Sequence, residues 1–161
     1  MNKGGTMKKI PVKNYFILVG MIVIVVIVTF FLAKFYNNML KPTSDFYKYA
    51  KHISSRELFD YLQENSSTII YISDKYNTVI EDQEKVFKEK IVEHNLYNNL
   101  IYIDKNGLTE DFYKQFNKKY NTHINEYNLP VIIILDDSVV KNAYYSLSVE
   151  TVVGINFGDI K

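Results

Sequence analysis

Cysteine is absent from this sequence of 161 residues. A chain without cysteine cannot form a disulfide framework, a zinc or iron–sulfur site built on thiolates, or a lipidated cysteine, and it has no cysteine nucleophile. Hydrophobic residues still make up 47% of the chain and aromatic residues 15%, which is enough to bury a core. The length predicts one ordinary domain rather than two.

Motifs for several other chemistries are missing as well. His52, His94 and His123 lie far apart without HxxxH or HExxH spacing, so no metal site is predicted. The glycines form no phosphate-cradling pattern and there is no GxSxG motif, so neither nucleotide binding nor serine hydrolysis is supported. The adjacent acids Asp136 and Asp137 are typical of a turn. We therefore predict no cofactor and no catalytic residue.

Positive charge is concentrated in one short segment. Residues 1–13 carry four lysines and no acidic residue, whereas the remaining 15 basic and 18 acidic residues all follow Ala33 and sum to −3. The formal net charge of +1 is therefore the sum of a basic N-terminal segment and an acidic body. Because the body lacks a concentrated positive patch, nucleic acid is not expected as a partner.

A long uncharged run follows the basic segment. Residues 14–33, between Lys13 and Lys34, are 20 residues that would span about 30 Å as a helix, the thickness of a bilayer core. Aromatic residues flank the run as interfacial anchors do: Tyr15, Phe16, Phe35 and Tyr36. We predict a transmembrane helix over 14–36. A cleaved signal peptide is the alternative, but its apolar run is usually about 7 to 15 residues and a small-x-small site would follow it.

The lysines also predict an orientation. Four of them precede the helix without an offsetting acid, while Lys34 and Lys41 after it are mixed with Asp45. This asymmetry places residues 1–13 in the cytoplasm. The expected protein is single-pass in the cell membrane, contacts lipid through its N-terminal helix, and has an extracellular C-terminal domain.

The remaining chain is divided into a linker and a domain. Phe46, Tyr49, Ala50 and Ile53 recur at helical spacing, so residues 37–53 are predicted to be a juxtamembrane helix that spaces the domain from the membrane. Residues 54–161 are predicted to be the extracytoplasmic domain.

Helices and strands alternate in this domain. Two capping boxes, Ser54-x-x-Glu57 and Thr78-x-x-Glu81, predict one helix that begins at Ser55 and another that is capped by Thr78. Further helices are predicted over 109–120 and 148–154. The predicted strands are 68–72, 100–103, 131–135 and 139–145. The order indicates an α/β fold, a mixed sheet of parallel strands plus a C-terminal β-hairpin with helices on both faces.

Three segments carry a resemblance to a known superfamily. A capped helix at Ser54–Leu58 precedes an apolar strand at Ile69–Ser73, and Leu129-Pro130 stands directly before the hairpin. The chain resembles the thioredoxin-like superfamily over residues 54–155. Its sequence is similar in general character to membrane-anchored bacterial members, including bacteriocin transport accessory proteins. The resemblance implies a cis Pro130.

The same resemblance implies a Cys-x-x-Cys pair after the first strand. In this sequence its two places fall on Asn77 and Ile80. Neither residue can supply the thiolate that thiol–disulfide exchange requires, so oxidoreductase activity by the family mechanism is excluded. Tyr76, Asn77, Leu129 and Pro130 are then candidates for the rim of a binding site that takes an extended peptide as an added strand. A plain turn at Pro130 and a solvated loop at Tyr76 are the alternatives.

The leading hypothesis is a redox-inactive, non-enzymatic membrane protein that binds or assembles another envelope or secretion component. One alternative is an accessory or self-protection factor of bacteriocin export, which the resemblance alone implies. Another is an enzyme with a non-thiol site near Asp74, with His94 as its partner.

Overall fold

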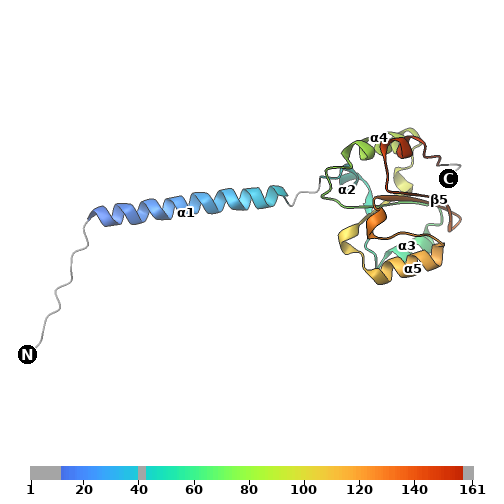
Figure 1. The fold of residues 1–161 in the computed structure, drawn as a ribbon, viewed down its shortest axis with the longest axis horizontal. Helices are drawn as coiled ribbons and strands as arrows, with labels where there is room; N and C mark the ends of the chain where they lie inside the picture. The colour runs from blue at the N-terminus through green and yellow to red at the C-terminus, as the bar shows by residue number, and fades with distance from the viewer. Residues whose placement is uncertain (1–11, 40–42, 158–161) are drawn as a thin grey trace, which may run out of the picture. The chain divides into compact units, whose positions relative to one another are not determined.

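A computed structural model describes residues 12–39 and 43–157, and the chain forms two compact units, Met1–Lys41 and Pro42–Lys161. The first unit contains one helix, α1 (Val12–Met39), which is drawn in blue in Figure 1. Its segment Lys13–Asn37 is long and apolar enough to cross a membrane, and none of it is buried. A signal sequence near an N-terminus would meet the same criterion, so insertion in the membrane stays a prediction.

The second unit is built on a five-stranded sheet with the order β1-β3-β2-β4-β5. Its strands are β1 (Lys51–His52), β2 (Thr68–Ser73), β3 (Leu100–Asp104), β4 (Val131–Asp136) and β5 (Val139–Tyr145). Strand β3 runs parallel to both β1 and β2, while β4 is antiparallel to β2 and to β5. The predicted mixed sheet of parallel strands with an antiparallel C-terminal hairpin is therefore confirmed.

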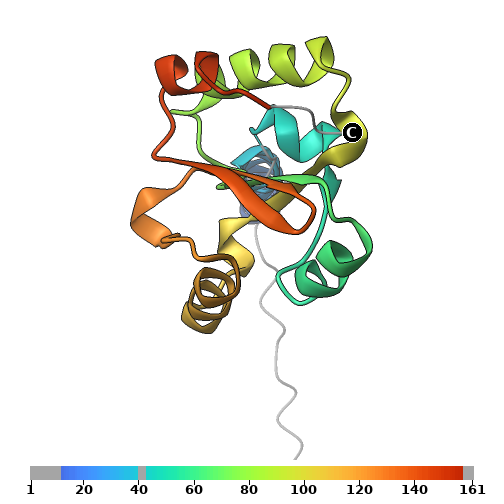
Figure 2. The same ribbon diagram turned by 90° about the vertical axis from the view of Figure 1, so that its right-hand side faces the viewer.

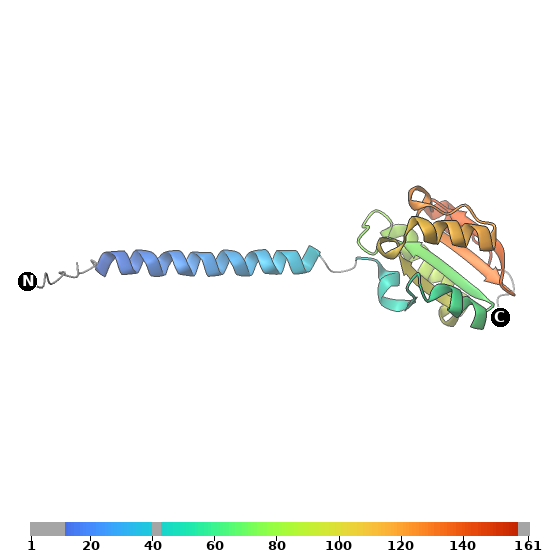
Figure 3. The same ribbon diagram turned by 90° about the horizontal axis from the view of Figure 1, so that it is seen from below.

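Helices cover both faces of the sheet (Figure 2). One face carries α2 (Asp45–Tyr49), α4 (Glu81–Glu93) and α6 (Val149–Val153), and the other carries α3 (Leu58–Glu64) and α5 (Glu110–Tyr120). Figure 3, seen from below, shows α3 and α5 in front of the strands. All six residues of β2 are buried, as expected for a central strand that is packed on both sides.

Strand side chains alternate between two hydrophobic clusters, one on each face. Ile69 and Tyr71 face Phe46 of α2 and Phe87 of α4. The second cluster joins the intervening residues of β2 to the helices of the opposite face: Leu58, Leu62, Ile70, Ile72, Phe112 and Phe116. The domain therefore has one core layer on each side of the sheet.

Two of the predicted helix starts are confirmed by their caps. The side chain of Thr109 accepts a hydrogen bond from the backbone N–H of Phe112 at the start of α5, at 3.2 Å. Ser148 does the same for Thr151 at the start of α6, at 3.2 Å. Each cap satisfies an amide that the first turn of a helix leaves without a partner.

The two predicted capping boxes do not form as expected. Glu57 accepts hydrogen bonds from the backbone N–H and the hydroxyl of Ser54, but 55–57 form a turn and α3 begins only at Leu58. Helix α4 begins at Glu81 with Ile80, not Thr78, as its cap residue, and Ile80 makes no side-chain capping bond. The competing interaction is an Asx turn before the helix, in which Asn77 accepts from the amide of Val79 at 2.9 Å.

Residues 43–53, which the sequence assigned to a linker, pack into the sheet domain. Phe46 in α2 is only 2% exposed and belongs to the core. Lys51 and His52 form β1, which pairs with β3, and this strand was not predicted. The compact unit thus extends well before residue 54, and helical spacing alone did not reveal what the apolar residues pack against.

Candidate functional site

The Leu129-Pro130 peptide bond is cis, as the resemblance implied. Val131, the first residue of β4, pairs with Ile72 near the end of β2. The dipeptide before β4 and the loop after β2, which holds Tyr76 and Asn77, therefore lie at the same end of the central strands. A rim made of these residues requires this shared end, and its use as a binding site stays a prediction.

Leu129 is half-buried at this end of the sheet, and its backbone is open in the sense that its two polar groups are not used by the described residues. The carbonyl of Asn128 accepts a hydrogen bond from the N–H of Ser146 at 2.9 Å, and that of Pro130 accepts from Leu147 at 3.4 Å. Within the described ranges 12–39 and 43–157, neither the N–H nor the carbonyl of Leu129 between them has a hydrogen-bond partner. A donor and an acceptor on one extended residue are what an added antiparallel strand uses.

Ion pairs fix the loop after β2 to the loop after β3. Asp74 binds Lys105 at 3.0 Å, and the next residue, Lys75, binds Asp104 at 2.8 Å. Partial burial alone would raise the pKa of Asp74, but the Tyr76 N–H and the Lys105 ammonium outweigh it and hold that pKa below its usual value. The loop that carries the rim is therefore held in place by charge.

The two positions that match the Cys-x-x-Cys pair differ in environment. Asn77 is half-buried, lies in the loop before α4, and uses its side-chain oxygen on the Val79 amide. Ile80 is 4% exposed and belongs to the core. Between them Val79 is 81% exposed, which was not predicted from the sequence. The correspondence of Asn77 and Ile80 with family cysteines stays a prediction.

The structure does not bring Asp74 and His94 together. Asp74 follows β2 and binds Lys105 and Asn106, whereas His94 follows the far end of α4 with its ring beside Phe157. A helix of 13 residues is about 20 Å long, which separates the two groups far beyond hydrogen-bond reach.

No metal-binding cluster is found in the part of the chain that the structure describes, where no three side chains of the ligating types converge. The predicted turn lies at the end of β4: Asp136 is the last residue of the strand, and the turn residues Asp137 and Ser138 have positive φ angles of 51° and 62°. Asp136 accepts a hydrogen bond from Ser67 at 2.8 Å. These acids have a structural role in the hairpin.

The edge of the sheet that is formed by β5 is poorly suited to strand addition. The register shifts between Ile134 and Leu135, which pair with Asn142 and Val140, so Lys141 is left as a bulge in the edge strand β5. Bulges and edge lysines are common devices that block pairing with another chain. Backbone groups suited to strand addition are therefore found at Leu129 rather than along β5.

A polar groove lies beside the rim and was not predicted from the sequence. It has a volume of about 830 Å³ and is lined by the loop after β3, by α5 and by the turn before Leu129. The lining residues are Lys105, Asn106, Leu108, Glu110, Tyr113, Lys114, Asn117, Ile124, Asn125, Glu126 and Tyr127. Tyr127 is 90% exposed.

Comparison with known proteins supports the fold and nothing narrower. No family model matches the chain, and no curated protein matches it. One solved structure, described as "A putative oxidoreductase with a thioredoxin fold", matches with a TM-score of 0.50 and 14% sequence identity, over 67% of this chain and 94% of that chain. At this identity the likeness concerns the fold alone. With the observed strand order, it shows that the sheet domain has a thioredoxin-like fold.

Proposed function

We propose that this protein is a redox-inactive, membrane-anchored thioredoxin-like protein that binds or assembles another envelope or secretion component. The open backbone of Leu129 supports the proposal most directly, because it lies at a fixed rim where no side chain can perform thiol chemistry. Tyr76, Asn77, Leu129 and Pro130 form this rim. The narrower role in bacteriocin export rests on the resemblance alone, and no described contact favours it.

An extended segment of the partner is proposed to add to the rim as a short strand. It would donate to the carbonyl of Leu129 and accept from its N–H, while Tyr76, which is 39% exposed, contacts the side chains. Main-chain hydrogen bonds of this kind give affinity for many sequences, and neighbouring side-chain contacts give selectivity.

Site-specific photo-crosslinking tests the binding role. A benzophenone amino acid at Tyr76 is expected to capture one partner protein in native membranes. Tyr97 is the matched control, because it is also 39% exposed but precedes β3, at the opposite end of the parallel strands. Equal products from both positions, or none from Tyr76, would contradict the proposal.

Redox inactivity is tested by a separate assay. The purified protein is expected not to accelerate the reduction of insulin, and acceleration would contradict this part of the proposal.

The proposed membrane topology can be tested through the missing cysteines. A single Val79→Cys variant is expected to react with a membrane-impermeant maleimide on intact cells, because Val79 is 81% exposed and the domain is proposed to lie outside. An Asn2→Cys variant is expected to react only after the cells are opened. Labelling in the reverse order would overturn the orientation, and loss of the N-terminal label from the mature protein would indicate a cleaved signal.

A further inference from the structure

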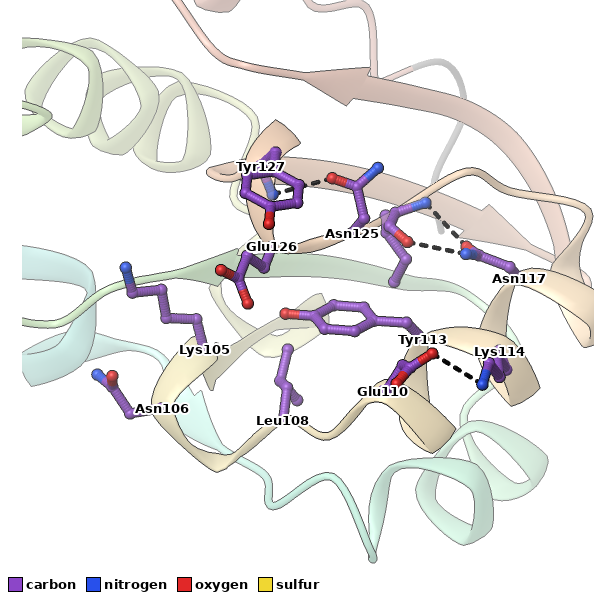
Figure 4. A pocket seen from close by; sticks show the side chains of 11 residues that line it. Lys105, Asn106, Leu108, Glu110, Tyr113, Lys114, Asn117, Asn125, Glu126 and Tyr127 are labelled. Atoms are coloured by element: carbon purple, nitrogen blue, oxygen red, sulfur yellow. Dashed lines mark hydrogen bonds and ion pairs between the residues drawn. The ribbon is translucent and has the colours of Figure 1, made fainter.

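The polar groove is continuous with the rim along the chain. The 3₁₀ turn η3 (Glu126–Asn128) forms one wall and ends directly before Leu129. Figure 4 shows Tyr127 and Glu126 of this turn above the ring of Tyr113 from α5. A peptide that pairs with Leu129 therefore has side chains within reach of the groove.

Reciprocal hydrogen bonds hold the turn η3 rigidly. The side-chain oxygen of Asn125 accepts from the N–H of Tyr127 at 2.9 Å and from that of Asn128 at 3.2 Å. The Asn128 side chain accepts from the N–H of Asn125 at 2.9 Å and donates to the carbonyl of His123 at 2.7 Å. Tyr127 thus projects into solvent from a fixed backbone, so little conformational entropy is lost when a ligand covers its ring.

The wall behind the turn is also preformed. The side chain of Asn117 in α5 accepts from the N–H of Ile124 and donates to its carbonyl, each at 2.8 Å. Its oxygen also accepts from the hydroxyl of Thr122 at 2.8 Å. These bonds attach the segment before η3 to α5, so the groove exists before any ligand arrives.

One acidic group in the groove lacks a counter-charge. Lys105 binds Asp74 at 3.0 Å and Lys114 binds Glu110 at 2.8 Å. Glu126 has no ion-pair partner among the residues that the structure describes. The pKa of the Tyr113 phenol is raised by burial and by the negative charge of Glu126, which places that charge over the groove. The groove therefore offers two phenol rings and one uncompensated carboxylate.

We infer that this groove binds a lysine or arginine side chain of the extended peptide that pairs with Leu129. The cationic group contacts the Glu126 carboxylate, and its aliphatic stem lies against Tyr113 and Tyr127. Residues 43–157 carry 12 basic and 17 acidic side chains, a formal charge of −5 that attracts a basic partner. The inference rests on the proposed function, because the same peptide must occupy the rim.

Two peptide libraries test the inference on the full chain in lipid nanodiscs. Each contains eight-residue peptides of mixed valine, threonine and serine, with either lysine or the uncharged norleucine at one scanned position. The lysine peptides are expected to be enriched about tenfold over the norleucine peptides, from the carboxylate contact and the ring contacts together. Glu126→Gln is expected to reduce this ratio to below threefold, and Tyr127→Ala to reduce it several-fold.

Glu93→Gln is the matched control, because Glu93 is also exposed but lies near the C-terminal end of α4, away from the groove. It is expected to leave the ratio unchanged. Equal enrichment of lysine and norleucine peptides, or a ratio unaffected by Glu126→Gln, would overturn the inference and leave the strand-addition proposal standing. If neither library is enriched, both proposals fail.

Discussion

Replacement of Phe46 by alanine is expected to lower the free energy of unfolding of the sheet domain by about 3 to 4 kcal/mol. Phe46 is 2% exposed, and its ring centroid lies 4.7 Å from that of Phe87 and 5.2 Å from that of Tyr71. Alanine would leave a cavity where α2 and α4 meet the sheet, since the rings around it are fixed by other contacts. Urea unfolding of the full chain in detergent micelles, followed by near-UV circular dichroism of the tyrosines, measures the change.

Tyr49→Ala is the matched control for this substitution. Tyr49 lies in the same helix but is 58% exposed, and its described ring contact is with the ammonium of Lys88, 3.9 Å from the ring centroid. Its removal should cost less than about 1 kcal/mol, because exposed cation–π contacts are weak. If Phe46→Ala were no more destabilising than Tyr49→Ala, α2 would be only a spacer, as the sequence suggested.

The segment with α2 and β1 was predicted to be a linker, whereas the central strands were predicted correctly. The strands β2 and β4 were predictable because burial on both faces requires continuous apolar runs, and both runs are buried along nearly their whole length. Strand β1 has only two residues, Lys51 and His52, and both side chains are exposed. Its pairing with β3 depends on backbone groups, which leave no pattern in the side chains.

The candidate site was predictable only where one short motif carries it. Leu129-Pro130 can be recognised as a dipeptide, and its cis bond followed from the resemblance. The groove beside it is lined by three separate segments whose asparagines look like ordinary loop residues. The spacing of Asn125 and Asn128 is the one local signal that could have revealed the rigid turn η3, since a side chain at each end can cap the other.

Glu84 lies in the first turn of α4 with Glu81 and Asp82, where acidic side chains favour the start of a helix, but it also has a second role. It is 2% exposed, and its carboxylate accepts from the hydroxyl of Ser44 at 2.8 Å, the N–H of Asp45 at 3.0 Å and the hydroxyl of Tyr71 at 3.0 Å. It therefore caps the N-terminus of α2 from a different helix and connects that helix to the sheet.

Glu84→Ala is expected to lower the free energy of unfolding by about 3 to 5 kcal/mol, because three buried or partly buried donors would lose their acceptor at once. Urea unfolding of the full chain gives the value. Glu81→Ala is the control, because Glu81 is exposed in the first turn of the same helix, and its loss should cost less than about 1 kcal/mol. A similar small loss for both variants would show that Glu84 does not hold α2 in place.

The Glu84 carboxyl should also make stability depend on pH. Burial raises its pKa above the usual value of 4.5 in spite of the donors from Ser44 and Tyr71. Because its pKa is higher in the folded protein than in the unfolded chain, the folded protein binds more protons in the interval between the two values. The contribution of Glu84 to stability therefore increases as the pH falls from neutral through the raised pKa towards 4.5.

A comparison with Glu84→Gln isolates this effect, since glutamine cannot ionise and has nearly the same shape. The unfolding free energy of the unmodified protein minus that of Glu84→Gln is expected to be larger at about pH 5 than at neutral pH. Glu81→Gln, measured in the same way, should show no such increase, because its carboxylate is exposed to water. A difference that stays constant or shrinks on acidification would mean that the donors, rather than burial, control the ionisation of Glu84.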